Sequence, residues 1–387
     1  MELNLSNVDY KHTVQGEILS PLLNLTRLEW LDLSGNDFEG TPIPHFIGSF
    51  HKLKYLELYG SNFSGVIPSQ LGNLSSLYHL GLQSTLDAAS IAHRLDWLSD
   101  LSSLSFLDLN YVNLSTVSQS WLSEVNMLPS LRELYLEECD LNNIPSSFSS
   151  HLNLTSLVLL DLGFNDFYST IPNWLWNLTK LSALDFYESS LFGPIPIEIG
   201  TLSRLRKLYL DNTIDLASCI VGPRFPQWLR SQKSMIELSL SNTSIEDNVP
   251  NWFWNISSTT IDLSHNKLSG TLPLSLEGMP TLELLVLSFN KLEGVVPSWP
   301  PQIMMLDLSF NNFSALPSKG LGFIVDTVLR VEEETTARFK RGRLSVHFGS
   351  AADRSSLLPR CCHLAGAAAS ALCAVGCTFD AAPTERP

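Results

Sequence analysis

Residues 28–40 read LEWLDLSGNDFEG, and residues 157–167 read LVLLDLGFNDF. In both stretches leucines alternate with polar or variable residues ahead of an Asn, which is the period of a short strand with one buried face. One such strand buries too little apolar surface to be stable alone. If the pattern recurs at a fixed period, the strands can stack into a parallel sheet and their leucines can form one continuous core.

The pattern recurs twelve times. The units begin at Leu28, Leu53, Leu77, Leu104, Leu131, Leu157, Leu181, Leu205, Met235, Ser258, Leu282 and Ile303. The mean period is (303 − 28)/11 = 25 residues, within the 20 to 29 residues typical of leucine-rich repeats. We therefore predict an α/β repeat solenoid with a parallel β-sheet on its concave face. Its parts are a partial N-terminal repeat (1–27), the solenoid (28–318) and a divergent, disordered tail (319–387).

Three positions after the last strand leucine, an Asn amide can bond backbone groups of its own turn and of the neighbouring coil. Five units have this residue, and we predict a structural ladder of Asn36, Asn165, Asn266, Asn290 and Asn311. The other units have Ser61, Thr85, Val112, Cys139, Ser189, Thr213 and Thr243 there. Because an unpaired buried backbone group costs about 1–3 kcal/mol, we expect looser or hydrated coils at Val112 and Cys139.

Two units are longer than the others. Between Leu77 and Leu104, the spacing of Ile91, Leu95 and Leu98 predicts an amphipathic helix on the convex side. In the unit that begins at Leu205, two prolines predict an irregular loop followed by a short helix.

Charge and cysteine content exclude several functions. The formal net charge is −15, and residues 1–318 carry 15 Lys/Arg against 32 Asp/Glu. A chain that displaces counterions from phosphates needs a basic stripe, so no nucleic acid partner is expected. Four of the six cysteines fall in the last 27 residues, which leaves no disulfide framework and no zinc ligand set in the repeats.

Catalytic and targeting motifs are also missing from the sequence. We find no nucleophile elbow, zinc-protease motif, phosphate-binding loop or kinase motif set, so we expect no enzyme, no metal and no cofactor. The opening MELNLSNVDY has neither a basic start nor an apolar run and predicts no signal peptide. Residues 363–379 are too short and too polar to predict a membrane span.

The second half of many units continues with an L-x-G-x-I-P segment, as in NFSGVIPSQLGNLSS (62–76), SLFGPIPIEIGTLSR (190–204) and NKLSGTLPLSLEGMPT (266–281). This segment resembles the plant-specific subtype of leucine-rich repeat, whose arrays form right-handed superhelices. Longer phrases, such as NDFEGTPIPHFIGSFHKLKYL (36–56) and WLSEVNMLPSLRELYLEECDL (121–141), are similar to the ectodomains of plant receptor-like proteins related to the fungal-xylanase receptors.

The resemblance covers about residues 1–318 and implies a function. It implies a cell-surface receptor on the extracellular side of the plasma membrane that binds a peptide or protein ligand in immune or developmental signalling. It also implies partner receptor kinases as co-receptors. Relative to that family, the signal peptide, both caps, the later repeats and the membrane span are missing, so we expect an ectodomain truncated at both ends.

Glycosylation signals of the form N-x-[ST] agree with an extracellular location. The candidates are Asn24, Asn62, Asn73, Asn113, Asn153, Asn177, Asn242, Asn255 and Asn312, with Asn4 a weaker one inside a strand. Because NLT and NLS also belong to the repeat pattern, their number overstates this support.

Ligands of such solenoids are expected on the concave face, where the residues between core leucines point. The place between the second and third leucine is acidic in seven of twelve units, at Asp32, Glu57, Asp108, Asp161, Asp185, Asp262 and Asp307. We interpret these residues as solvated structural carboxylates. A catalytic pair would need raised pKa values, which such a ladder could imitate.

The variable positions of the central units are more informative. We predict a ligand-binding patch of Arg132, Glu133, Tyr135, Glu137, Glu138, Tyr187, Glu188, Arg206, Lys207 and Tyr209, because Tyr and Arg are favoured at binding hot spots. An upstream run of Trp30, Tyr55, Tyr59, Phe106 and Tyr111 is the next candidate.

Two functions remain open. One is the receptor ectodomain, and the other is a secreted polygalacturonase-inhibitor-like protein that blocks cell-wall-degrading enzymes. The inhibitors have about ten repeats between cysteine-paired caps, so the twelve units found here favour the receptor.

Overall fold

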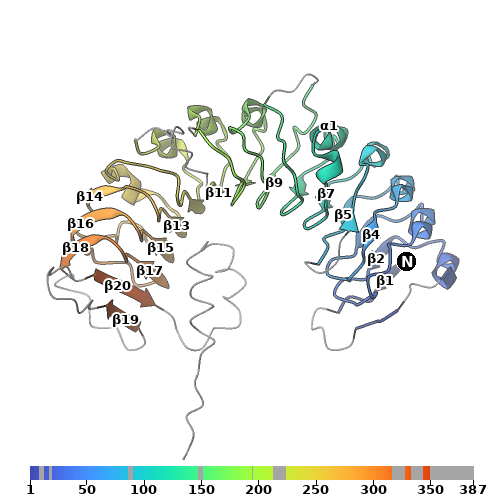
Figure 1. The fold of residues 1–387 in the computed structure, drawn as a ribbon, viewed down its shortest axis with the longest axis horizontal. Coiled ribbons are helices and arrows are strands. Elements are labelled where there is room, and N and C mark those ends of the chain that lie inside the picture. Colours follow the sequence, from blue (N-terminus) through green and yellow to red (C-terminus); the bar gives the residue numbers. More distant parts are fainter. Residues whose placement is uncertain are drawn as a thin grey trace, which may run out of the picture.

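The computed structural model describes residues 1–315, apart from 8–12, 17–19, 86–89, 147–150, 194 and 212–223, and the backbone of 327–332 and 343–348. The chain winds into coils that follow one another along an arc (Figure 1). Strands line the inner side of the arc and short helices line its outer side. This placement confirms the predicted repeat solenoid with a concave sheet.

One parallel sheet of thirteen strands forms the concave face, with one strand from each coil in chain order. Its strands are β1 (Glu2–Asn4), β2 (Trp30–Asp32), β3 (Tyr55–Glu57), β5 (His79–Gly81), β7 (Phe106–Asp108), β8 (Glu133–Tyr135), β9 (Leu159–Asp161), β10 (Ala183–Asp185), β11 (Lys207–Tyr209), β12 (Glu237–Ser239), β13 (Thr260–Asp262), β15 (Leu284–Val286) and β17 (Met305–Asp307). The register keeps equivalent residues side by side, as in Leu160, Leu184 and Leu208. Each inward leucine therefore packs on the leucine of the next coil.

The outer side consists mainly of 3-10 helices. They are η1 (Ser20–Asn24), η2 (His45–Ser49), η3 (Ser69–Asn73), η4 (Asp96–Asp100), η5 (Ser115–Val117), η6 (Asn173–Asn177), η7 (Ile197–Thr201), η8 (Gln227–Ser231) and η9 (Asn251–Asn255), with one α-helix, α1 (Trp121–Val125). Six of these helices directly follow a proline, such as Pro68 before η3. The proline carbonyl accepts the first bond of the turn, from Leu71 N at 3.1 Å in η3. The Ile-Pro pair thus starts the outer helix.

Additional short strands follow the Asn position of some coils. β14 (Ser269–Thr271), β16 (Lys291–Val295) and β18 (Asn312–Ala315) form a second parallel sheet on the outer side of the last coils (Figure 1). β4 (Gly65–Val66) and β6 (Ser90–Ile91) pair in the same way nearer the N-terminus.

The amphipathic helix predicted from Ile91, Leu95 and Leu98 is wrong for the residues that the structure describes. Ile91 lies in strand β6 opposite Val66, and the chain then forms the 3-10 helix η4. Leu95 and Leu98 are buried because they fill the core positions that other coils fill before and inside their own 3-10 helices. In the other long unit, the predicted short helix is η8, whereas most of the irregular loop lies outside the described residues.

Leucines of successive coils form a single apolar core. The core-facing leucines of the repeat pattern, from Leu28 to Leu308, are between 0 and 3% exposed. A fully buried Leu or Ile contributes roughly 1.5–3 kcal/mol, so the stack as a whole supplies the main driving force for folding. Larger side chains such as Trp121 and Phe253 fill the wider space under the outer helices.

The side chain of each Asn in the predicted ladder bonds two neighbouring coils. Asn266 Nδ2 donates to the carbonyl oxygens of Leu240 and Leu263, at 2.7 and 3.1 Å, and its Oδ1 accepts from the N–H of Thr243 and Ile245. The amides of Asn36, Asn165, Asn290 and Asn311 also donate to backbone carbonyls of their own coil and of the preceding coil.

Units without this Asn use another donor. Ser61 and Ser189 donate their hydroxyls to the carbonyls of Leu33 and Leu162, and the Cys139 thiol lies 3.1 Å from the carbonyl of Leu109. Val112 and Cys139 are both fully buried. The thiol bond speaks against the expected loosening at Cys139, whereas the loosening at Val112 stays a prediction. The hydroxyl or thiol satisfies the carbonyl that the Asn amide would otherwise bond.

Within the predicted tail, the structure describes only two antiparallel strands, β19 (Thr327–Glu332) and β20 (Arg343–Phe348). The apolar stretch 363–379 and the four C-terminal cysteines lie outside the described residues. In the part of the chain that is described, no helix has the length and apolar character needed to cross a bilayer.

Candidate ligand-binding surface

The acidic row of the concave sheet serves the turns that follow the strands. The Oδ1 atoms of Asp161, Asp185 and Asp262 each accept the N–H of the residue two positions later, at 2.8 to 3.0 Å. Asp262 and Asp307 are buried, so the interpretation as solvated carboxylates is wrong for this end of the row.

Burial raises the pKa of several of these carboxyl groups. Burial raises the pKa of Asp108 to about 7 and that of Asp262 to about 6. Asp211 follows strand β11. Burial and the charge of Asp262 raise the pKa of Asp211 to about 8. Its Oδ1 accepts from the Ser239 hydroxyl at 2.5 Å and from Ser241 N at 2.8 Å. These bonds connect Asp211 to strand β12 and to the turn that follows it.

Aromatic rings stack across the first coils of the concave face. Trp30 and Tyr55 lie 3.5 Å apart between ring centroids, Tyr55 and His79 4.0 Å, and His79 and Phe106 4.0 Å, with interplanar angles of 2°, 13° and 9°. His79 also lies 2.9 Å from the Glu57 carboxylate, which turns over Gly81. The sequence analysis missed His79, although it is in register with Tyr55 and Phe106. The four rings form a continuous, half-buried strip.

The central patch is only partly assembled as predicted. Tyr135 and Tyr209 are half-buried on the sheet, and their hydroxyls bond Glu133 and Glu237. Lys207 Nζ lies 2.8 Å from Glu237. Burial, with these carboxylates next to the phenols, raises the pKa of both tyrosines and keeps them neutral. Because each hydroxyl proton is already donated to a carboxylate, a ligand would contact the rings and could donate a hydrogen bond to the hydroxyl oxygens.

Tyr187 is the exception, because it is buried with 7% of its surface exposed. Phe186 fills the third leucine position, so Tyr187 falls in the turn and packs against Phe164 of the preceding coil, 5.1 Å away. Glu188 and Glu138 lie at the same turn position with positive φ, and Glu137 is half-buried beside Tyr111. Counting all of these as strand positions was wrong, since β8 ends at Tyr135 and β10 at Asp185.

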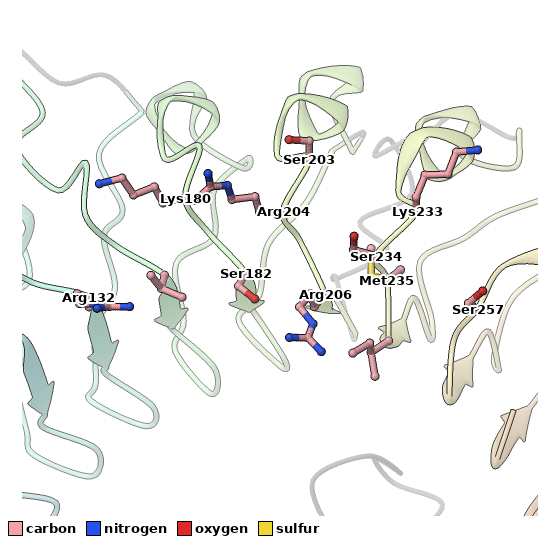
Figure 2. A pocket seen from close by; sticks show the side chains of 12 residues that line it. Arg132, Lys180, Ser182, Ser203, Arg204, Arg206, Lys233, Ser234, Met235 and Ser257 are labelled. Atoms are coloured by element: carbon pink, nitrogen blue, oxygen red, sulfur yellow. The ribbon is translucent and has the colours of Figure 1, made fainter. Parts of the chain in front are cut away.

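Arg132 and Arg206 come just before their strands, at the lateral edge of the sheet. They line an open groove of about 710 Å³ together with three cations that the sequence analysis missed, Lys180, Arg204 and Lys233 (Figure 2). The signal was present in the sequence, because these cations flank the first leucine of nearby units. In the described ranges, no group of three or more His, Cys, Asp or Glu residues could hold a metal ion.

Several glycosylation candidates lie away from the concave face. Asn24, Asn73, Asn177 and Asn255 are exposed at the last residue of outer 3-10 helices. Asn62 and Asn113 are half-buried, and their amides bond Asp37 and Asp140.

Comparison with known proteins identifies the repeats. A family model described as Leucine Rich Repeat matches residues 27–50, 52–74, 130–151, 156–178 and 257–279. Receptor-like protein EIX1 of Solanum lycopersicum is 42% identical over 206 residues, which cover 52% of this chain and 19% of the relative. Receptor-like protein EIX2 of the same species is 33% identical over 288 residues, which cover 72% of this chain and 27% of the relative. Receptor like protein 24 of Arabidopsis thaliana is 30% identical over 336 residues, covering 75% and 38%.

Solved structures agree on the fold. The plant peptide hormone receptor RGFR1 in complex with RGF2 matches with a TM-score of 0.57 at 24% identity, over 81% of this chain and 52% of that chain. The PEPR1–AtPEP1 structure matches with a TM-score of 0.58 at 23% identity, over 81% of this chain and 45% of that chain. The chain is thus a leucine-rich-repeat solenoid. Its resemblance to the plant leucine-rich-repeat receptor-like proteins is confirmed, and it spans about a fifth to two fifths of the length of the relatives it matches.

Proposed function

We propose that this chain is part of the ligand-binding ectodomain of a plant cell-surface receptor-like protein. It binds a peptide or protein ligand on its concave face, has no enzymatic activity, and acts in immune or developmental signalling through partner receptor kinases. The observation that carries the proposal is its sequence relationship to receptor-like proteins, which extends over most of the described coils. The exposed outer Asn residues support glycosylation on the extracellular side of the plasma membrane.

The central concave patch is the proposed ligand site. Tyr135 and Tyr209 combine apolar rings with neutral hydroxyls, and Lys207 adds a cation next to them. Such residues dominate binding energy when a ligand excludes water around them. The aromatic strip from Trp30 to Phe106 extends this surface toward the N-terminal coils.

The alternative is a secreted inhibitor of cell-wall-degrading enzymes, and the complete transcript of the locus distinguishes the two. We expect an in-frame apolar segment of about 20 residues downstream of the repeats, as a receptor needs to cross the bilayer. A fluorescent tag fused to the end of that product should then mark the plasma membrane of leaf cells. A stop codon after a cysteine-paired cap, with the tag in the extracellular fluid, would overturn the receptor in favour of the inhibitor.

The double substitution Tyr135→Ala/Tyr209→Ala is expected to weaken ligand binding at least tenfold. The probe is a fungal xylanase, the ligand class that the resemblance implies, titrated against the complete chain by biolayer interferometry. Each substitution removes a ring and a hydroxyl oxygen that can accept a hydrogen bond at the proposed contact. Hot-spot truncations commonly cost ~2 kcal/mol or more.

The matched control is Tyr168→Ala, which removes a tyrosine that is 60% exposed outside the patch. Circular dichroism should show the same fold for all three proteins. Unchanged affinity of the double variant would remove the patch as the ligand site. Failure of the unaltered chain to bind xylanase would contradict the ligand class.

A further inference from the structure

The lateral groove has an unusual lining for so acidic a chain. Among the described residues that line it, five are cations, Arg132, Lys180, Arg204, Arg206 and Lys233, and none is acidic. Residues 1–318 carry only 15 Lys/Arg against 32 Asp/Glu, so a third of their cations border one groove. A solenoid that needed charge only for solubility would scatter these residues among its carboxylates.

The five cations are also unpaired in the described part of the chain. Among the described residues, no carboxylate lies within ion-pair distance of any of them, whereas Lys54, Lys207 and Lys267 each have a glutamate partner. All five are exposed. Unneutralised cations side by side repel one another, and an anion that bridges them removes this repulsion. The groove therefore presents a group of exposed, unpaired cations to a negatively charged ligand.

The cations follow the direction in which the coils stack. Figure 2 shows Lys180, Arg204 and Lys233 between the strands and the outer helices, with Arg132 and Arg206 at the beginning of their strands. A second hollow of about 470 Å³ shares four lining residues with the groove and extends it toward Ser130 and Ser156. The cations span five successive coils, counting the coil that lies between them without a cation. Four spacings of 4.7–4.9 Å between strands give the row of cations a length of about 19 Å. An extended peptide covers this length with about six residues.

We propose that this groove binds an extended, acidic peptide segment of a protein ligand. The inference rests on the proposed function for the class of ligand, but it adds a second surface at the lateral edge of the concave patch. Arginines can hold a carboxylate through two parallel N–H bonds, and the lysines act as point charges. Ser182, Ser203 and Ser234 add hydroxyl donors along the same line.

The lining favours a peptide over an acidic polysaccharide. Val158, Met235 and Ile236 place apolar atoms between the cations, where the methylene groups of glutamate side chains can pack. Among the described lining residues there is no aromatic ring on which a sugar could stack. Arg132 and Arg206 also join the groove to the concave patch, so one ligand can contact both surfaces.

The probe is a fluorescein-labelled ten-residue peptide of alternating Glu and Ser, titrated at low ionic strength against the complete chain by fluorescence anisotropy. The test variant is Lys180→Gln/Arg204→Gln/Lys233→Gln, and the matched control is Lys52→Gln/Lys267→Gln/Lys291→Gln. Both variants lower the formal charge by three, so they change long-range repulsion alike. Lys52 precedes Leu53 as Lys180 precedes Leu181, but it lies in a coil far from the groove.

We expect saturable binding that weakens with added salt, a loss of at least tenfold in the test variant and a change of less than threefold in the control. Equal losses of affinity in both variants, or no binding by the unaltered chain, would contradict the proposal that the groove binds an acidic peptide. If an oligogalacturonate of equal charge binds more tightly than the peptide and loses affinity in the same variant, the ligand of the groove is an acidic polysaccharide and the peptide proposal is wrong. The tyrosines are intact in both variants, so these results are independent of the xylanase titration.

Discussion

Replacing Asn165 by Ala is expected to lower the free energy of unfolding by about 3–5 kcal/mol. Asn165 is buried, and its Oδ1 accepts the N–H groups of Cys139 and Leu141 at 3.2 and 3.0 Å. Its Nδ2 donates to the carbonyls of Leu136, Leu162 and Gly163. Alanine leaves two buried N–H groups without a partner at the junction of two coils. The cost is large because water cannot reach them.

The measurement is guanidinium-induced unfolding followed by circular dichroism. Asn251→Ala is the control, because it removes an exposed Asn from the outer helix η9. The control should shift the unfolding midpoint by no more than the equivalent of about 0.5 kcal/mol. If Asn165→Ala unfolds at the same midpoint as the control, the ladder does not stabilise the stack.

Raising the pH from about 5.5 to about 8.5 is expected to destabilise the solenoid by several kcal/mol. The pKa values of Asp108, Asp211 and Asp262 lie at about 7, 8 and 6 in the folded chain, above the 3.8 of a free carboxyl group, because burial disfavours the charged form. The folded chain therefore binds more protons than the unfolded chain. The stability that these three groups contribute is fully present below the free-group value of 3.8 and falls as the pH rises through their folded pKa values.

Asp211→Asn isolates one contribution to this pH dependence. The Asn Oδ1 can still accept the Ser239 hydroxyl and the Ser241 N–H, but it does not ionise. We expect the variant to be more stable than the unaltered chain, with a gain about 2–3 kcal/mol larger at pH 8.5 than at pH 5.5. Glu277→Gln, at an exposed position, controls for the lost charge. The measurement is the melting temperature of each protein at both pH values. An equal gain in stability at the two pH values would contradict the raised pKa of the buried Asp211 carboxyl group.

The periodicity of the leucines was enough to predict the coils, the concave sheet and the direction of stacking. Each of these features depends on residues that repeat at fixed positions, and a single sequence displays them directly. The outer side was harder to predict. Leu95 and Leu98 have the spacing of an α-helix, yet the chain there forms the 3-10 helix η4.

The candidate site was predictable only in part, because its side chains come from different coils. The turn that buries Tyr187 depends on where strand β10 ends, and the leucine pattern does not mark that point. His79 gains its role from rings on neighbouring strands. The basic groove joins residues from successive coils, such as Lys180 and Arg204, 24 positions apart, and it becomes visible only when the coils are aligned in space.

Hydrogen exchange of the complete chain, followed by mass spectrometry, tests the continuous stack most directly. Each strand donates to the next coil, as Leu33 N does to Glu57 O, Leu162 N to Asp185 O and Leu287 N to Asp307 O. We predict slow exchange in every strand segment from Leu33 to Leu287, with no break along the array. Strand segments in the middle of the array that exchange as fast as the unfolded chain would contradict a single solenoid.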